Sequence, residues 1–227
     1  MTPSRSVIAS LARTVIVGYL LLGALILGVG LLVTATFESS SLSADDTISR
    51  WLVRSREPVG EALSGVASSL GNTTVIVCGL LGFCVAALSA RWWQPAYMIA
   101  GGLAIELGVF LSVNFWLDRP RPDLPVLGSV PSTASFPSGH AAAAVVFYLG
   151  LALTATCRIE RRSIRRLVWA VACVVAFSVG IARAYRGVHH PSDIVAGWAL
   201  GIGALLITAA AISKTSSPCD VPSAASS

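Results

Sequence analysis

Long runs of residues without a charge constrain this chain more than any other feature, because a helix needs about 20 apolar residues to cross the core of a bilayer. Charged residues make up only 12% of the 227 residues, which is about half of their usual share in a soluble domain. The apolar runs cover residues 14–37, 62–90, 93–117, 139–157, 167–182 and 194–213. The sequence therefore predicts an all-α fold, an integral membrane bundle of six helices.

No polar linker divides the chain, so one bundle is expected rather than two domains. Residues 1–58 are expected to hold the first transmembrane helix, whose apolar run is too long for a cleaved signal peptide, followed by an amphipathic segment. Residues 59–213 are expected to form the functional core with helices two to six. Residues 214–227 are rich in Ser, Ala and Pro, which predicts a disordered tail.

The amphipathic segment at residues 43–58 has two interpretations. Ile48, Trp51 and Leu52 fall on one helical face, and an apolar stripe of this kind suits a helix that lies on the membrane surface. An ordinary solvated connector explains the pattern equally well.

The basic residues orient the predicted bundle. Five arginines crowd the short loop between helices four and five, namely Arg158, Arg161, Arg162, Arg165 and Arg166. Because positive loops stay in the cytoplasm, the loops after helices one, three and five are expected on the extracytoplasmic side. Arginines between apolar spans also explain the net charge of +5, and the absence of a basic patch with interleaved aromatics indicates no nucleic-acid partner.

Three polar strings interrupt the apolar chain, and parity places all of them on the extracytoplasmic side. They cover residues 114–122, 135–140 and 182–193 and contain all three histidines of the protein. Chance would not readily concentrate the histidines and two pairs of arginines on one face. The sequence therefore predicts a catalytic pocket at the extracytoplasmic surface.

Several residues of these strings suit the binding of a phosphate group. Arg121 and Arg183 offer planar sets of donors that match phosphate oxygens and keep their charge. Ser138 is placed as the N-cap of helix four, so the following amides, beginning with Gly139, point out of a helix N-terminus where anions bind. A glycine there lets an oxyanion approach the backbone closely.

The histidines supply groups for covalent catalysis. His189 and Asp193 are four residues apart at the start of helix six, so the carboxylate can reach one imidazole nitrogen, fix its tautomer and stabilise the cation that forms. His140 can protonate the leaving oxygen. The strings thus combine an anion site, a nucleophile, an orienting carboxylate and an acid.

Each string alone has a structural explanation. Arg-Pro-Arg-Pro is commonly a helix stop, Pro-Ser-Gly-His suits an N-cap, and His189 with Asp193 suits a structural hydrogen bond. The combination of all three, in order and on one face, favours a catalytic site.

Together the strings resemble the three-part signature of the type 2 phosphatidic acid phosphatase family, which shares its site with vanadate haloperoxidases. The family pattern is Lys-x6-Arg-Pro, then Pro-Ser-Gly-His, then Ser-Arg-x5-His-x3-Asp. Residues 121–122 match the end of the first part, residues 137–140 the second, and Arg183, His189 and Asp193 the third. The resemblance extends over roughly residues 59–213, including the helical layout.

The resemblance implies a role for each matching residue. His189 would be the nucleophile, Asp193 its orienting group and His140 the general acid, while His190 would be a neighbour of the site. The phosphate would be held by Arg121, Ser138, Gly139 and Arg183.

Two positions depart from the family pattern. The family lysine falls on Asn114, and the serine before the family arginine is Ala182. Asn114 would then face the phosphate with a hydrogen-bond donor and no charge, which leaves the site one cation poorer. The preference for a diphosphate or a monophosphate is therefore open.

The function that the resemblance implies is a membrane lipid phosphate phosphatase that works through a phospho-histidine intermediate without a metal or other cofactor. Its partners would be the bilayer and a lipid phosphate, with a polyprenyl diphosphate favoured and phosphatidic acid or phosphatidylglycerol phosphate next. The expected location is a bacterial plasma membrane; the oligomeric state is not predicted.

Two rival functions need separate tests. A six-helix transporter would use Glu106, the one charge within the third apolar run, as a proton or ion relay. A vanadate-dependent haloperoxidase would use the same three strings, although that chemistry is usually found on soluble chains.

Overall fold

The computed structural model describes residues 4–39 and 44–214, and within these ranges it contains helices and no strand. The predicted tail at residues 214–227 lies, apart from its first residue, outside the described part of the chain. The helices are α1 (Arg5–Ser39), α2 (Ala44–Arg54), α3 (Pro58–Leu70), α4 (Thr73–Ser89), α5 (Trp93–Trp116), α6 (Gly139–Ala144), the π-helical turn η1 (Val145–Leu149), α7 (Gly150–Thr156), α8 (Arg162–Tyr185) and α9 (Pro191–Ile212).

The predicted six-span bundle is confirmed, with one span broken. Five helical segments of the described chain are long and apolar enough to cross a membrane, and α3 with α4 makes a sixth when this pair, bent by 46°, is counted as one span. The second apolar run is therefore two helices instead of one. The break falls at Gly71 and Asn72, where the Asn72 side chain caps α4 by accepting a hydrogen bond from the Thr74 amide at 3.1 Å. The short fifth run extends into polar flanks to give α8.

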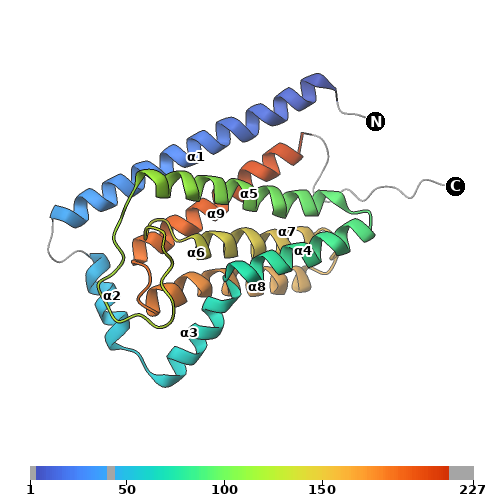
Figure 1. Ribbon diagram of the computed structural model, residues 1–227. Helices are drawn as coiled ribbons and strands as arrows, with labels where there is room; N and C mark the ends of the chain where they lie inside the picture. Colours follow the sequence, from blue (N-terminus) through green and yellow to red (C-terminus); the bar gives the residue numbers. More distant parts are fainter. Residues whose placement is uncertain (1–3, 40–43, 215–227) are drawn as a thin grey trace.

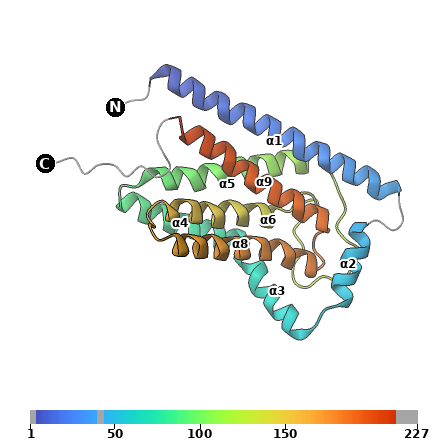
Figure 2. The same ribbon diagram turned by 180° about the vertical axis from the view of Figure 1, so that it is seen from behind.

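Helix α9 lies in the middle of the bundle and packs against α1, α5, α6 and α8 (Figures 1 and 2). The shared core contains Met98 and Val109 of α5, Val146 of η1 and Leu200 of α9, none of which is exposed. The outer faces carry exposed apolar side chains instead, as lipid-facing helices do. Leu21, Leu111 and Leu206 are examples, each more than half exposed.

Two glycines set the distance between α9 and α6. A Cβ atom at Gly197 would lie 2.5 Å from the carbonyl oxygen of Ser138, and one at Gly201 would lie 2.6 Å from that of Ala142. Only a residue without a Cβ lets the two backbones come so close. This contact fixes the start of α6 against the first turns of α9, where the second and third polar strings lie.

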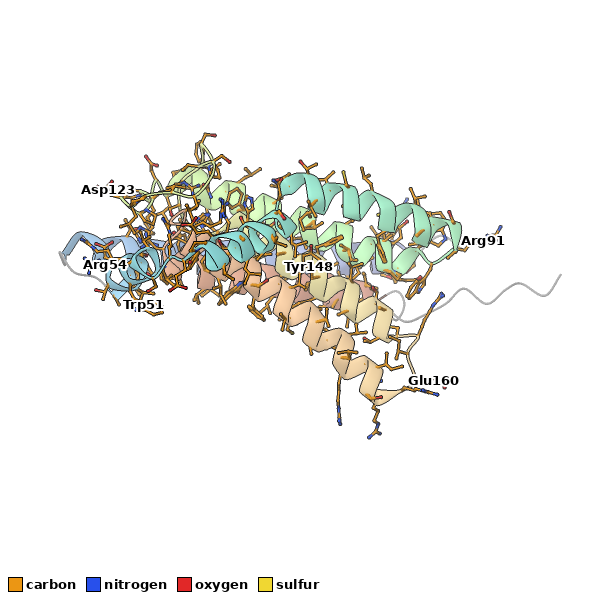
Figure 3. The ribbon with its side chains drawn as sticks, turned by 90° about the horizontal axis from the view of Figure 1, so that it is seen from below. Trp51, Arg54, Arg91, Asp123, Tyr148 and Glu160 are labelled. Carbon is orange, nitrogen blue, oxygen red and sulfur yellow. The ribbon has the colours of Figure 1, made fainter. Side chains whose placement is uncertain are left out.

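The two ends of the bundle differ in what they carry. Trp51 and Arg54 of α2 and Asp123 of the α5–α6 loop gather at one end, whereas Arg91 and Glu160 lie at the other (Figure 3). At that second end, the Arg158 guanidinium stacks 3.9 Å from the Trp92 ring centroid, and Lys214 after α9 donates to Ser10 of α1 at 3.1 Å. The three polar strings lie together at the end that holds α2.

Helix α2 runs crosswise to the spans at this end (Figure 1). The face expected from the sequence divides in the structure, because Ile48 and Trp51 are 45% and 63% exposed whereas Leu52 packs against the apolar cluster of Ala141 and Ile194. The helix is thus attached to the bundle on one side and presents large apolar side chains on the other.

We expect Gly197→Ala to force α9 away from α6, because the added methyl group would collide with a backbone carbonyl. Thermal unfolding in detergent should show a loss of about 1–3 kcal/mol together with reduced activity. Gly82→Ala is the matched control, since Gly82 also lies within a helix but has open space around it. Equal stability of the two variants would contradict the close contact.

Candidate active site

Asp193, in the first turn of α9, connects the three polar strings. Its backbone carbonyl accepts a hydrogen bond from the Ser138 amide at 3.0 Å, which joins α9 to the residue before α6. One carboxylate oxygen, Oδ2, accepts from the Ser135 hydroxyl at 2.5 Å and from the His190 amide at 2.8 Å. His190 is the N-cap of α9, and it forms a capping box with Asp193. The expected position of His190, beside the site, agrees with this structural role.

The other carboxylate oxygen of Asp193 binds Arg119 in an ion pair from which water is excluded. Arg119 is 1% exposed and Asp193 is fully buried. The same guanidinium donates to Asp45 of α2 at 2.8 Å and to the Ser192 hydroxyl at 2.8 Å. Asp45 in turn accepts from the Ser192 amide at 2.9 Å. Arg119 therefore holds two carboxylates from distant parts of the chain.

Arg119 and Asp45 were not among the residues expected at the site. The first string contains two arginines two residues apart, and a buried carboxylate such as Asp193 requires a positive partner. This requirement could have singled out Arg119 next to Arg121. No comparable signal existed for Asp45, because its partner lies 147 residues away at Ser192.

His189 lines the cavity described below, and each of its ring nitrogens has a different neighbour. Its Nδ1 atom lies 2.8 Å from the carbonyl oxygen of Ser135, and because a carbonyl only accepts, the proton belongs on Nδ1. The lone pair then belongs to Nε2, which lies 3.4 Å from Nη1 of Arg121. The expected contact with Asp193 is looser, since its Oδ2 is 3.6 Å from Nδ1. The carbonyl of Ser135 sets the tautomer, and Asp193 places a negative charge nearby.

Burial lowers the pKa of the His189 imidazole below its usual value, and the Asp193 carboxylate opposes this effect while the guanidinium groups of Arg121 and Arg183 add to it. The neutral form of His189 is the one that burial favours. A neutral imidazole with its lone pair on an accessible nitrogen is a nucleophile.

The two predicted phosphate-binding arginines both lie close enough to His189 to act on it electrostatically. Arg121 is anchored through the carbonyl oxygens of Val188 at 2.9 Å and Thr133 at 3.0 Å. Arg183 is 6% exposed and donates from Nη1 to the Ser68 hydroxyl at 3.4 Å. Its Nε and Nη2 atoms, and the hydroxyl of Ser138, are buried without a hydrogen-bond partner in the described part of the chain. Donors in this state suit an anionic ligand.

A cavity of about 450 Å³ extends from the candidate site residues along α4 and α5. Its polar end is formed by Arg121, Thr133, Gly139, His140 and His189. Its remaining wall is largely apolar and comes mainly from α4 and α5, with Ala143 of α6. Val77 and Leu107 belong to this wall and are 46% and 53% exposed, so the cavity reaches the lipid-facing surface between the two helices.

Asn114 is placed differently from the expectation that it faces the phosphate. Its side-chain amide donates to the carbonyl oxygens of Phe110 at 3.1 Å and Phe136 at 3.3 Å, and it is not part of the cavity wall. It joins the end of α5 to the segment that leads into Ser138.

The side chains of the site do not form a recognisable set of metal ligands among the described residues. Within the described residues no three His, Cys, Asp or Glu side chains form a group that could hold a metal ion. The carboxylate at the centre, Asp193, is already bound by Arg119 and Ser135.

Comparison with known proteins adds a family relationship. The sequence pattern of the PAP2 superfamily matches residues 92–216, which contain all three strings. The chain is 30% identical over 180 residues to phosphatidylglycerophosphatase B of Bacillus subtilis, covering 76% of this chain and 85% of that protein. It is 35% identical over 71 residues to an undecaprenyl-diphosphatase of Sulfolobus acidocaldarius, covering 31% of this chain and 30% of that one.

Solved structures give the same relationship in three dimensions. The crystal structure of a transmembrane PAP2-type phosphatidylglycerolphosphate phosphatase from Bacillus subtilis matches with a TM-score of 0.72 and 25% identity, over 90% of this chain and 96% of that one. Aquifex aeolicus LpxE matches with a TM-score of 0.59 and 21% identity, over 74% of this chain and 96% of its own. The second match is a likeness of fold.

We expect Arg119→Leu to destabilise the protein by about 3–5 kcal/mol, because it leaves the buried Asp193 carboxylate without its charged partner. Phosphate release should fall as well. Chemical unfolding in detergent measures the first effect. Arg50→Leu is the matched control, since Arg50 forms a 2.8 Å ion pair with Asp46 that is open to solvent and should cost at most about 1 kcal/mol. Similar costs for both variants would contradict the central role of Arg119.

Proposed function

The chain belongs to the PAP2 superfamily and is a membrane-embedded lipid phosphatase, and from this premise we propose that it hydrolyses a glycerophospholipid phosphate through a covalent intermediate on His189. The observation that carries the proposal is that one cavity is lined by both His189 and His140 and by apolar side chains of α4 and α5. A phosphate at the polar end would leave its lipid chains along that wall. This arrangement favours a phosphatase over the transporter considered above.

The proposed reaction has two steps. Nε2 of His189 attacks phosphorus, so a P–N bond forms while the P–O bond to the lipid breaks, and His140 gives its proton to the leaving oxygen. Water then attacks the phosphorus of the phospho-histidine, His140 takes a proton from that water, and free phosphate leaves with His189 restored. Both histidines line the same cavity.

The proposed phosphate site uses fixed donors. Arg121 and Arg183 supply positive charge, the amides that begin with Gly139 supply donors at the start of α6, and Ser138 supplies a hydroxyl. Because Arg183 and Ser138 are buried and Arg121 is held by backbone carbonyls, these groups need little rearrangement as negative charge develops. In this proposal Asn114 does not contact the phosphate. Its hydrogen bond to the Phe136 carbonyl helps to position the segment that precedes Ser138.

The substrate that we favour carries one phosphate on a glycerol backbone. The site lacks the lysine of the family pattern, which makes it poorer in positive charge for a diphosphate. The relative of greatest coverage above is named for phosphatidylglycerophosphate. A polyprenyl diphosphate is the second candidate, supported by the shorter match to an undecaprenyl-diphosphatase.

We also propose that the site faces outward across a plasma membrane. The arginine-rich connection between α7 and α8 lies at the end opposite the site, and positive connections stay in the cytoplasm. In a cysteine-free background, Val126→Cys should react with an impermeant thiol reagent in intact cells, whereas Ser163→Cys should react only after lysis. The reverse pattern would place the site on the cytoplasmic side.

We expect His189→Ala to lower phosphate release by several orders of magnitude while the protein remains folded, because the nucleophile is lost. The assay is release of phosphate from detergent-solubilised phosphatidic acid and phosphatidylglycerol phosphate. His190→Asn is the control, since asparagine keeps an N-cap for α9 and His190 is not the proposed nucleophile.

Activity of the wild-type protein should survive EDTA and be inhibited by vanadate. Near-wild-type turnover by His189→Ala would rule out the phospho-histidine mechanism.

The pH dependence follows from the lowered pKa of His189. Neutral imidazole is the reactive form, so a lowered pKa keeps the enzyme active below pH ~6.5, the usual value for histidine. Asp193→Asn removes a group that raises this pKa, so the acidic limb should move to still lower pH while the rate falls. The measurement is kcat/KM against pH, corrected for ionisation of the substrate phosphate. An acidic limb that moves upward in Asp193→Asn would contradict this assignment.

A further inference from the structure

Glu106 is an acidic side chain in the cavity wall that the proposed reaction does not use. It lies in the middle of α5, is 4% exposed and lines the cavity together with Leu103, Leu107 and Phe110. Its carboxyl group forms no hydrogen bond or ion pair with another described residue. An ionised carboxylate without a partner is costly in such surroundings, whereas a neutral carboxyl keeps one O–H donor.

The position of Glu106 along the cavity can be estimated from the helix. Phe110 packs against Gly139 at the polar end, with its ring 3.1 Å from where a Cβ of Gly139 would lie. Glu106 precedes Phe110 by one helical turn, which is roughly 6 Å along the axis. Ala100 and Leu103 of α5 and Leu80 of α4 continue the wall beyond it. The carboxyl group therefore lies between the phosphate end and the hydrocarbon end.

A ligand with a polar group at this depth would satisfy Glu106. In a glycerophospholipid the ester carbonyls follow the phosphate by a few covalent bonds, and hydrocarbon follows the esters. In a polyprenyl phosphate, hydrocarbon begins directly after the phosphate, and the carboxyl group would lose any water without gaining a partner.

We propose that Glu106 is a specificity-determining residue that donates a hydrogen bond to an ester carbonyl of a glycerophospholipid substrate. The inference rests on the proposed function. It adds that the glycerol ester region of the lipid is recognised by a residue outside the phosphate site. It selects a diacylglycerol phosphate over a polyprenyl phosphate by chemistry at one position in the cavity.

The test compares matched lipids on the purified full-length protein in mixed micelles. The substrates are dioleoyl phosphatidic acid, its diether analogue, which lacks both carbonyls, and farnesyl phosphate. The readout is the ratio of kcat/KM between ester and ether. The wild type should favour the ester by roughly three- to ten-fold, the value of one neutral hydrogen bond.

Two substitutions of Glu106 separate hydrogen bonding from shape. Glu106→Gln keeps a donor and should retain the preference for the ester, whereas Glu106→Leu should reduce the ratio to about one. Glu106→Leu should also raise kcat/KM for farnesyl phosphate, because the unsatisfied polar group is gone. Leu111→Ala, on the lipid-facing side of the same helix, is the control and should keep the wild-type ratio.

Failure of this inference is distinguishable from failure of the proposed function. A wild-type ratio of one with vigorous turnover overturns the role of Glu106 and leaves the phosphatase intact. The same holds if Glu106→Leu keeps the wild-type ratio. If the wild type releases no phosphate from any of the three lipids, the proposed function itself fails. The wild-type ratio is measured without any substitution. It can therefore overturn the proposal even if a Glu106 variant fails to fold.

Discussion

The buried carboxylate of Asp193 is the group on which the rest of the site depends. A charge without water must be matched by positive charge and hydrogen bonds within the protein. Asp193 obtains these from Arg119, the Ser135 hydroxyl and the His190 amide, so satisfying one group draws together segments from all three polar strings. The same Ser135 presents its carbonyl to His189. The orientation of His189, the proposed nucleophile, thus follows from the compensation of the Asp193 charge at the start of α9.

The membrane-spanning part of the fold serves this arrangement by bringing backbones close. Gly197 and Gly201 let α9 approach α6 until carbonyls would touch a Cβ atom, and the amide of Ser138 then reaches the carbonyl of Asp193. Helix packing in lipid relies on such close contact because burial of apolar surface gains little there. The position of Asp193 and the stability of the bundle therefore rest on the same few small residues.

Much of this could be predicted from the sequence, because hydrocarbon permits few alternatives. A charge-free run of sufficient length must be helical, and this rule predicted the spans. Counting the spans then placed the three polar strings on the same side of the membrane. What could not be predicted depends on particular contacts. The Nδ1 partner of His189 is a backbone carbonyl that no spacing reveals, and Asp45 reaches Arg119 from a segment far away in the chain. Asn114 was aligned with a phosphate ligand, yet its amide is taken by two carbonyls at a helix end.

The opening of the cavity between α4 and α5 has a kinetic consequence. A substrate that arrives through Val77 and Leu107 does so by diffusion in two dimensions, so its effective concentration is a mole fraction in the surface and not a molarity. Added inert lipid would slow the enzyme by surface dilution even at constant bulk substrate. The two products also part at once, since the lipid alcohol returns sideways to the bilayer while inorganic phosphate escapes to water. Their separation into different phases makes recombination at the site rare.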